Sequence, residues 1–227
     1  MLIDNSFLRE RVGVFENRED AGRRLASFLN EKGIFADVVA AIPNGGVPVG
    51  YHIARSLNAE FRAAVVKKVL FPWTSEAGFG AVSWTNHIAL DERAILDMGL
   101  SDEEVDLAVK KALKEVKERS KLFEKFLPKD VKNKSVVVVD DGLATGYTML
   151  VAVKSVRALG ASKVIVACPT ASSTSINVVS EAADIVVVLN LRSGVLFAVA
   201  DAYKNWYDLR SEEALIYFLN FCSKRQV

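Results

Sequence analysis

The sequence predicts a doubly wound α/β fold, in which a mostly parallel sheet carries helices on both of its faces. Two observations define this fold class. Apolar runs of strand length alternate with helical patterns after residue 134. Those runs are continuous, which is typical of strands buried on both faces. The 227 residues suffice for one domain with a full core, and no repeat or linker divides them, so we expect a single domain over residues 1–227.

The first third of the chain predicts helices and strands in alternation. Ala21, Leu25 and Leu29 form one apolar face, which predicts a helix. An apolar run that stops at the residues PNGG predicts a buried strand ending in a tight loop. The elements expected here are a helix over 17–29, a strand over 37–42, a helix over 47–57 and a strand over 61–70.

Periodicity breaks down over residues 71–98, where Pro72, Gly78 and Gly80 interrupt the pattern. A segment of that length without clear elements is usually functional, so we expect a lid or a small hairpin excursion. Its aromatic residues, among them Trp73, have two interpretations. They either stack on a bound base or hold a hairpin or a homodimer contact in place.

A long helix follows, and its start is marked by a capping box of Ser101 and Glu104. Pro128 follows its end. Many lysines lie along this helix, but glutamates interleave with them. The pattern therefore indicates a solvated, salt-bridged face rather than a nucleic-acid interface.

The second half of the chain is regular. The alternation predicts strands over 136–140, 163–168 and 184–189, with helices over 147–159 and 173–183 between them. Crossovers between parallel strands should be right-handed. A closing helix is expected over 211–222, within a hood or closing segment over 190–227.

Composition excludes several classes of protein. The formal net charge of +1 gives no overall attraction to nucleic acid or to an anionic membrane. No apolar run approaches the roughly 20 residues of a membrane span, and the N-terminal residues do not resemble a signal peptide. Cys168 and Cys222 lie far apart, without metal-site spacing, which suggests a reducing compartment. We therefore expect a soluble, cytoplasmic protein.

The segment 135–149, SVVVVDDGLATGYTM, carries the chemistry. A buried strand ends in two carboxylates, Asp140 and Asp141, at the edge of the sheet where open α/β folds bind ligands. A loop of small residues, 142–146, then leads into a helix. The backbone N–H groups of five residues can converge there with the helix dipole to bind an anion. These residues are Ala144, Thr145, Gly146, Tyr147 and Thr148.

Carboxylates beside a phosphate-binding loop suit a ligand with a phosphate at one end and hydroxyl groups at the other. Asp140 and Asp141 can accept hydrogen bonds from the vicinal hydroxyls of a ribose. The loop lacks the lysine of a nucleoside-triphosphate P-loop, and it is not a GxGxxG dinucleotide loop. The alternative is an ordinary strand–turn–helix, in which both acids serve as turn or capping residues.

The residues VVVVDDGLATGYT resemble the phosphoribosyl pyrophosphate (PRPP) binding motif of type I phosphoribosyltransferases. The segment IPNGGVPVG resembles the pyrophosphate loop of that family, and would place Asn44, Gly45 and Gly46 against pyrophosphate. NREDAGRRLASFL, VVKKVL and FAVADAYKNWYD resemble one branch of the family, whose acceptor is generally unassigned. One departure is Asn44, which stands where the family usually has a basic residue.

The resemblance implies transfer of the phosphoribosyl group from PRPP to a nitrogenous base or related acceptor, with release of pyrophosphate. Asp140 and Asp141 would hold the ribose hydroxyls near an oxocarbenium-like transition state. Mg²⁺ would bind mainly through substrate oxygens and water, with Asp140 or Asp141 reaching it through the substrate. Lys68 would pair with pyrophosphate, although a surface lysine is the alternative.

The acceptor site is the least defined part of the prediction. Trp73 and Trp206 are its candidates, and a structural role is the alternative for each of them. Two other functions stay open. A non-catalytic PRPP or nucleotide sensor on the same fold is one of them. A sugar-phosphate hydrolase is the other, although no nucleophile–base pair is evident.

Overall fold

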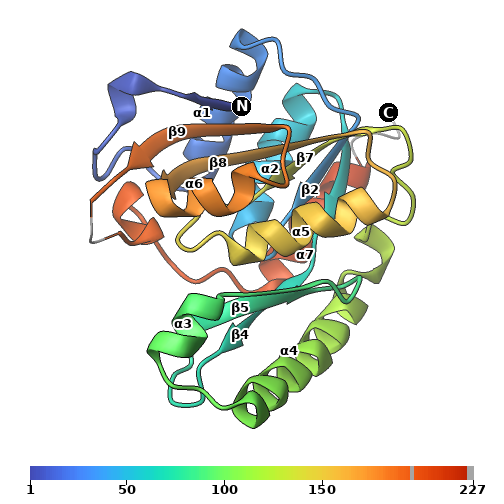
Figure 1. Cartoon of the computed structure of the whole chain (residues 1–227). Coiled ribbons are helices and arrows are strands. Elements are labelled where there is room, and N and C mark those ends of the chain that lie inside the picture. Colours follow the sequence, from blue (N-terminus) through green and yellow to red (C-terminus); the bar gives the residue numbers. More distant parts are fainter. Residues whose placement is uncertain (195–196, 224–227) are drawn as a thin grey trace.

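A computed structural model describes residues 1–194 and 197–223 of the chain. Its centre is a six-stranded, entirely parallel sheet with the strand order β1-β9-β8-β7-β2-β3 (Figure 1). The strands are β1 (Leu2–Asp4), β2 (Val38–Ala41), β3 (Glu60–Ala63), β7 (Ser135–Val139), β8 (Lys163–Ser172) and β9 (Ile185–Arg192). The predicted fold class is thereby confirmed.

Helices cover both faces of this sheet because its four central strands, β2, β7, β8 and β9, are apolar on both sides. Val137 and Val139 pack towards one set of helices, and Val136 and Val138 pack towards the other. The first set is α1 (Arg18–Glu31), α2 (Gly46–Ser56) and α7 (Ser211–Ser223). The second set is α5 (Tyr147–Ala158) and α6 (Ser173–Ser180). The four consecutive valines of β7 therefore serve two cores at once.

A second, antiparallel sheet with the order β4-β5-β6 forms a separate lobe, seen at the bottom of Figure 1. Its strands are β4 (Val66–Leu70), β5 (Gly78–Ser83) and β6 (Ile88–Leu90). The helices α3 (Glu92–Asp97) and α4 (Asp102–Leu122) follow them in sequence. This sheet packs against α4 on one side and against α5 on the other. We call the segment 66–122 the small lobe.

The prediction of one strand over 61–70 is wrong. The chain leaves the main sheet after Ala63, because β3 pairs in parallel with β2 while β4 pairs antiparallel with β5. The small lobe therefore begins at Val66, earlier than the predicted excursion over 71–98, and it includes α4. A continuous apolar run gives no signal of the point at which a strand changes sheets.

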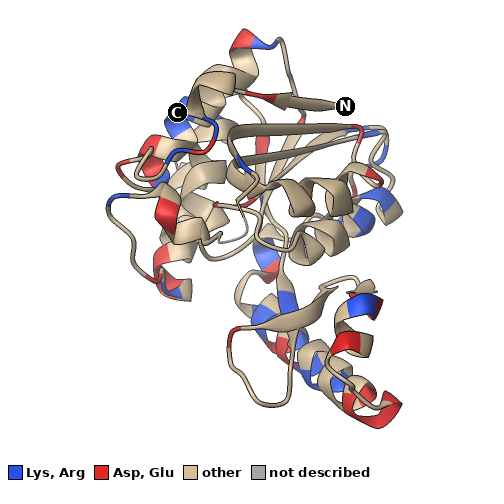
Figure 2. Cartoon of the chain, turned by 60° about the vertical axis from the view of Figure 1, so that its left-hand side comes forward, with Lys and Arg blue, Asp and Glu red and all other residues tan. Residues whose placement is uncertain are grey.

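Most helix starts follow their sequence signals. The Ser101–Glu104 capping box is formed at the start of α4, and the side chain of Asn17 caps α1. Lysine and acidic residues interleave along α4, so its surface carries both signs of charge (Figure 2). Strand β1 and three short 3₁₀ helices were not predicted. The latter are η1 (Ser6–Leu8), η2 (Glu124–Phe126) and η3 (Val199–Ala202).

Cys168 is buried and Cys222 is exposed, and both are free thiols. Within the described residues, no helix combines the length and the apolar character needed to cross a bilayer. The predicted closing helix over 211–222 corresponds to α7. Of the predicted hood segment 190–227, residues 195–196 and 224–227 lie outside the described residues.

Candidate functional site

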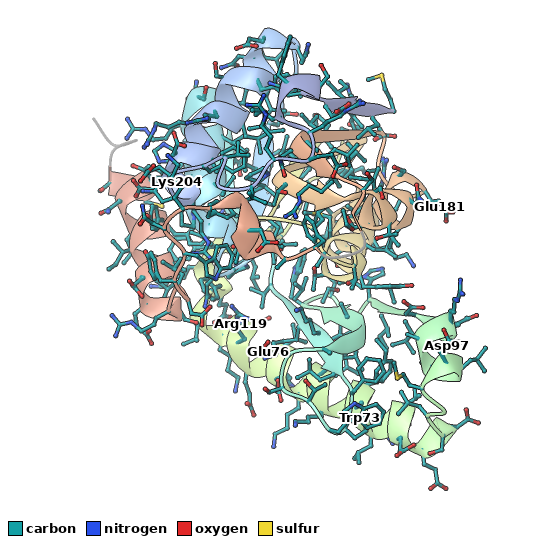
Figure 3. The ribbon with its side chains drawn as sticks, turned by 90° about the vertical axis from the view of Figure 1, so that its left-hand side faces the viewer. Trp73, Glu76, Asp97, Arg119, Glu181 and Lys204 are labelled. Atoms are coloured by element: carbon teal, nitrogen blue, oxygen red, sulfur yellow. The ribbon has the colours of Figure 1, made fainter. Side chains whose placement is uncertain are left out.

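A cavity of about 590 Å³ lies between the main sheet and the small lobe. Its main-sheet wall includes Asp140, Asp141 and the loop that follows them. Its small-lobe wall comes from β4, the β4–β5 turn and Arg119 of α4. Figure 3 shows Arg119 and Glu76 where the two parts of the molecule meet. The cavity therefore opens at the carboxyl end of the parallel strands, the edge at which open α/β sheets bind ligands.

The loop before α5 presents unpaired backbone donors. Gly146 caps the helix in the left-handed region, with a φ of 89°. For the N–H groups of residues 144–148, no acceptor is found within residues 1–194 and 197–223. A methyl group on Gly146 would also lie 2.9 Å from the carbonyl oxygen of Ser175. Only glycine fits this position, and the result is a concave set of donors at a helix N-terminus.

The carboxyl end of β8 holds this loop in place. The Leu143 N–H donates to the Thr170 carbonyl at 3.0 Å, and the Ser172 N–H donates to the Leu143 carbonyl at 3.0 Å. The Ser172 hydroxyl donates to the carbonyl of Ala144 at 2.7 Å. Strand β8 extends to Ser172, past the predicted end at Cys168, and these extra residues are the ones that position the loop.

Asp140 and Asp141 follow directly after β7 and have different surroundings. Burial, and next the neighbouring Asp141, raise the pKa of Asp140 well above its ordinary value. Asp141 instead forms an ion pair with Arg18, whose Nε lies 2.7 Å from Asp141 Oδ2. The side chain of Asp141 is only 14% exposed, and that of Arg18 only 8%. Asp141 thus has a cation as its direct partner, and among the described residues Asp140 does not.

Arg18 and Tyr203 complete the surroundings of Asp141. The Tyr203 hydroxyl donates to the Asp141 carbonyl at 2.6 Å. The Arg18 guanidinium lies over the ring of Trp206, 3.8 Å from its centroid, and donates to the Tyr207 carbonyl at 2.7 Å. The segment 203–207 therefore closes one side of the cavity, and one face of Trp206 is already covered.

The loop after β2 lies directly against the two acids. A side chain on Gly45 would overlap the Asp141 carboxylate, so glycine permits this close approach. A methyl group on Gly46 would lie 2.8 Å from Asp140 Cα. The Pro43–Asn44 peptide bond is cis. The Asn44 amide donates to the Leu209 carbonyl at 2.8 Å, and its Oδ1 accepts from Arg119 at 2.7 Å.

The structure brings most of the predicted site residues together. The side chains or backbone of eight of them line the cavity, namely Lys68, Asp140, Asp141, Ala144, Thr145, Tyr147, Thr148 and Trp206. Gly146, Asn44, Gly45 and Gly46 lie in the two loops that border it. Lys68 Nζ has a long contact of 3.5 Å with the Glu76 carbonyl, while Lys67 forms an ion pair with Glu115 at 2.9 Å.

Trp73 is the exception among the predicted residues. It stacks on Phe71, with ring centroids 5.3 Å apart, and it is 61% exposed. Figure 3 shows it in the small lobe, away from the meeting point marked by Arg119. Its position supports the structural interpretation, because neighbouring aromatic rings stabilise one another through stacking.

Three residues at the site were not predicted individually: Arg18, Arg119 and Tyr203. Arg18 is 123 positions from Asp141, and Arg119 is 75 positions from Asn44. Arg18 and Tyr203 lie inside segments that carry the family resemblance, NREDAGRRLASFL and FAVADAYKNWYD. Nothing in the local pattern of α4 distinguishes Arg119 from its many basic neighbours.

Comparisons with known proteins agree with this geometry. A family model described as the phosphoribosyl transferase domain matches residues 12–198. The structure of TT1426 from Thermus thermophilus is 30% identical, with a TM-score of 0.72, over 91% of this chain and 98% of that one. Curated relatives in two Mycobacterium tuberculosis strains, each named "Putative phosphoribosyl transferase", are 33% identical over 205 residues.

The chain therefore belongs to the phosphoribosyl transferase family, and the resemblance inferred from residues 136–148 is confirmed. The match to the mycobacterial relatives covers 90% of this chain but 46% of theirs, so the chain spans about half their length. Within the described parts of the chain, no group of three or more His, Cys, Asp or Glu side chains is arranged to hold a metal ion.

Proposed function

We propose that the protein transfers the 5-phosphoribosyl group of PRPP to a nitrogen atom of an acceptor base, with release of pyrophosphate. The observation that carries this proposal is one cavity that contains both an unpaired array of backbone donors and the Asp140–Asp141 pair. Membership of the family supports the same reaction class.

The three parts of PRPP match three parts of the cavity. The 5-phosphate fits the N–H groups of residues 144–148, since an anion at a helix N-terminus is stabilised by the donors and the helix dipole. The ribose hydroxyls fit Asp140 and Asp141 as acceptors. The pyrophosphate group fits the loop 43–46, which borders both acids.

In the proposed reaction the acceptor nitrogen forms a bond to the anomeric carbon as the bond from that carbon to pyrophosphate oxygen breaks. Positive charge develops on the ribose ring. Asp141, paired with Arg18 at 2.7 Å, lies where it can stabilise that charge. The small lobe limits the access of water to the reacting carbon, because it forms the opposite wall of the cavity.

The carboxylates at the cavity are suitable for an Mg²⁺ ion that binds together with PRPP. Asp140 and Asp141 supply hard oxygen ligands, but Asp141 is engaged by Arg18, so a protein cage for the ion is incomplete. We infer that Asp140 and Asp141 would hold Mg²⁺ through ribose hydroxyls or water. When bound, the ion would neutralise charge on the leaving group.

The acceptor is proposed only as a class, a nucleobase or a related nitrogen heterocycle. Trp206 is the candidate for stacking on it, through the face that Arg18 leaves uncovered. Homodimer formation stays a prediction.

A non-catalytic PRPP-binding protein is the second candidate function. It is favoured by Asn44, a neutral residue in the pyrophosphate loop. The two functions differ in one observable, because a sensor binds PRPP without releasing pyrophosphate in the presence of any base.

Calorimetry with PRPP and Mg²⁺ tests the proposal, with ribose 5-phosphate and ATP as comparison ligands. The variant to compare is Asp140→Asn, since removing a disfavoured buried charge leaves the fold intact. We expect saturable PRPP binding by the wild type, weakened about tenfold or more in the variant, because the amide replaces one acceptor oxygen of the carboxyl by a donor. Absence of both PRPP and ribose 5-phosphate binding by the wild type would refute the proposal.

If PRPP binds, a screen of purine and pyrimidine bases for pyrophosphate release separates the two candidate functions. Release with one base identifies the acceptor class. Tight binding without release across the screen would support the sensor.

A further inference from the structure

Arg119 of α4 has an environment that differs from that of every other cation at the cavity. Its guanidinium reaches across from the small lobe and donates to Asn44 Oδ1 at 2.7 Å. Its Nε is buried and, among the described residues, has no hydrogen-bond partner. Burial lowers the pKa of Arg119, while the nearby Asp140 acts in the opposite direction. Holding the positive charge of Arg119 at this buried position therefore costs desolvation free energy.

Of the other cations at or beside the cavity, Lys68 is exposed and reaches only the Glu76 carbonyl at 3.5 Å, and the remaining two have ion-pair partners. Arg18 pairs with Asp141, and Lys67 pairs with Glu115. For Arg119, no carboxylate within residues 1–194 and 197–223 lies at ion-pair distance. A guanidinium has five N–H donors, and a buried one without a counterion is stabilised by an anionic ligand. The unpartnered Nε therefore indicates an anion at this wall of the cavity.

Asn44 orients the guanidinium of Arg119. Its amide group is fixed by the Leu209 carbonyl, which orients Oδ1 towards the guanidinium. Position 44 therefore carries no charge itself, but it fixes a charge supplied by a distant helix. The loop 43–46 and Arg119 together form a surface next to the two acids.

We propose that Arg119 binds the pyrophosphate group of PRPP, and that it supplies from α4 the positive charge that the loop 43–46 lacks. This inference rests on the proposed function for the identity of the whole ligand, but not for its anionic group. The planar guanidinium can form paired hydrogen bonds with phosphate oxygens, a geometry that lysine cannot reproduce.

The test compares Arg119→Gln and Arg119→Lys with Lys117→Gln, an exposed residue on the same helix whose substitution removes the same charge. Affinities of pyrophosphate, PRPP and ribose 5-phosphate are measured by calorimetry with Mg²⁺. Ribose 5-phosphate is the internal control, because it lacks the pyrophosphate group but uses the loop 144–148. Melting temperatures are recorded for each variant.

We expect Arg119→Gln to weaken pyrophosphate and PRPP about 10- to 100-fold, the range for losing charge-assisted hydrogen bonds. Ribose 5-phosphate should change less than about twofold. Arg119→Lys should fall between Arg119→Gln and the wild type, and Lys117→Gln should match the wild type.

Two results would overturn the inference. One is unchanged pyrophosphate affinity in Arg119→Gln. The other is an equal loss of ribose 5-phosphate affinity, which would assign Arg119 a structural role in holding the two parts together. If the wild type binds pyrophosphate through Arg119 but does not bind PRPP, the proposed function fails while the anion site stands. If it binds neither, both fail.

Discussion

Asp140 is the residue at which the proposed function and the stability of the fold conflict most clearly. Its pKa is raised in the folded protein, so the folded state holds the proton more tightly than the unfolded chain does. At a pH below about 4, the pKa of an aspartate in the unfolded chain, Asp140 is protonated in both the folded and the unfolded state, and it does not reduce the stability of the fold. Stability then falls as the pH rises through the folded pKa, because the buried carboxyl must ionise.

We therefore predict that Asp140→Asn raises the melting temperature at pH 8 and that the difference disappears towards pH 4. The asparagine Oδ1 can still accept the hydrogen bond that the Asp141 N–H donates to Asp140 Oδ1 at 2.9 Å. Thermal unfolding of both proteins across this pH range is the measurement. A variant that melts below the wild type at pH 8 would contradict the assignment of a destabilising charge.

Asp141→Asn should have the opposite effect on stability. It leaves the buried Arg18 guanidinium without its counterion, and breaking a buried pair typically costs about 3 kcal/mol or more. Chemical denaturation measures the free energy of unfolding. Asp106→Asn is the matched control, because Asp106 pairs with Lys110 on the exposed surface of α4 and should cost less than about 1 kcal/mol. Equal effects at both positions would show that burial of the Arg18 pair contributes nothing.

At the scale of elements, the conformation of the loop before α5 depends on Gly146. A methyl group there meets both a positive φ of 89° and the Ser175 carbonyl at 2.9 Å. We predict that Gly146→Ala weakens ribose 5-phosphate binding about tenfold or more, through displacement of the backbone donors.

Gly33→Ala provides the control for Gly146→Ala. Gly33 also has a positive φ, of 65°, but no atom lies within 4 Å of the added methyl group. The Gly33→Ala variant should be about 1 kcal/mol less stable because of backbone strain, and its affinity for ribose 5-phosphate should be unchanged. Normal ligand binding by Gly146→Ala would count against the loop as the phosphate site.

Elements with local signals were predictable from the sequence, and elements defined by distant pairing were not. The Ser101–Glu104 capping box fixed the start of α4, and the valines of β7 indicated a strand buried on both faces. The break between β3 and β4 was missed, because the residues on both sides of it are equally apolar.

The same distinction holds for the candidate site. Its phosphate loop and acids lie within one continuous segment, so their order in the sequence revealed them. Arg18 and Arg119 meet that segment only through the tertiary fold, from helices far away in the sequence. A single sequence holds no record of such contacts.

At the scale of the whole molecule, side-chain contacts join the small lobe to the main sheet and to helix α5 on its face. Arg119 contacts Asn44, and Ser83 of β5 accepts a hydrogen bond from the buried Ser155 of α5 at 2.7 Å. Burial and the adjacent Asp91, which caps α3, raise the pKa of Tyr147 at the start of α5. A ligand in the cavity would add contacts to both parts.

We accordingly predict that PRPP with Mg²⁺ slows amide hydrogen exchange in β4, β5 and α4 as well as in the loop 144–148. Ligand binding stabilises every unit whose opening would break contacts with the ligand. Strand β1, at the far edge of the sheet, serves as the internal control and should not change. Protection confined to the loop would show that the small lobe does not contact the ligand.

The anchoring of the phosphate loop on β8 has a practical consequence. Because hydrogen bonds to Thr170 and Ser172 hold the loop in shape, its donors, if they bind phosphate as we propose, would select an oxyanion by size and charge. Sulfate has nearly the same dimensions as a phosphate monoester. Buffers rich in sulfate or inorganic phosphate would therefore act as competitive inhibitors, and turnover assays should be run in buffers free of both.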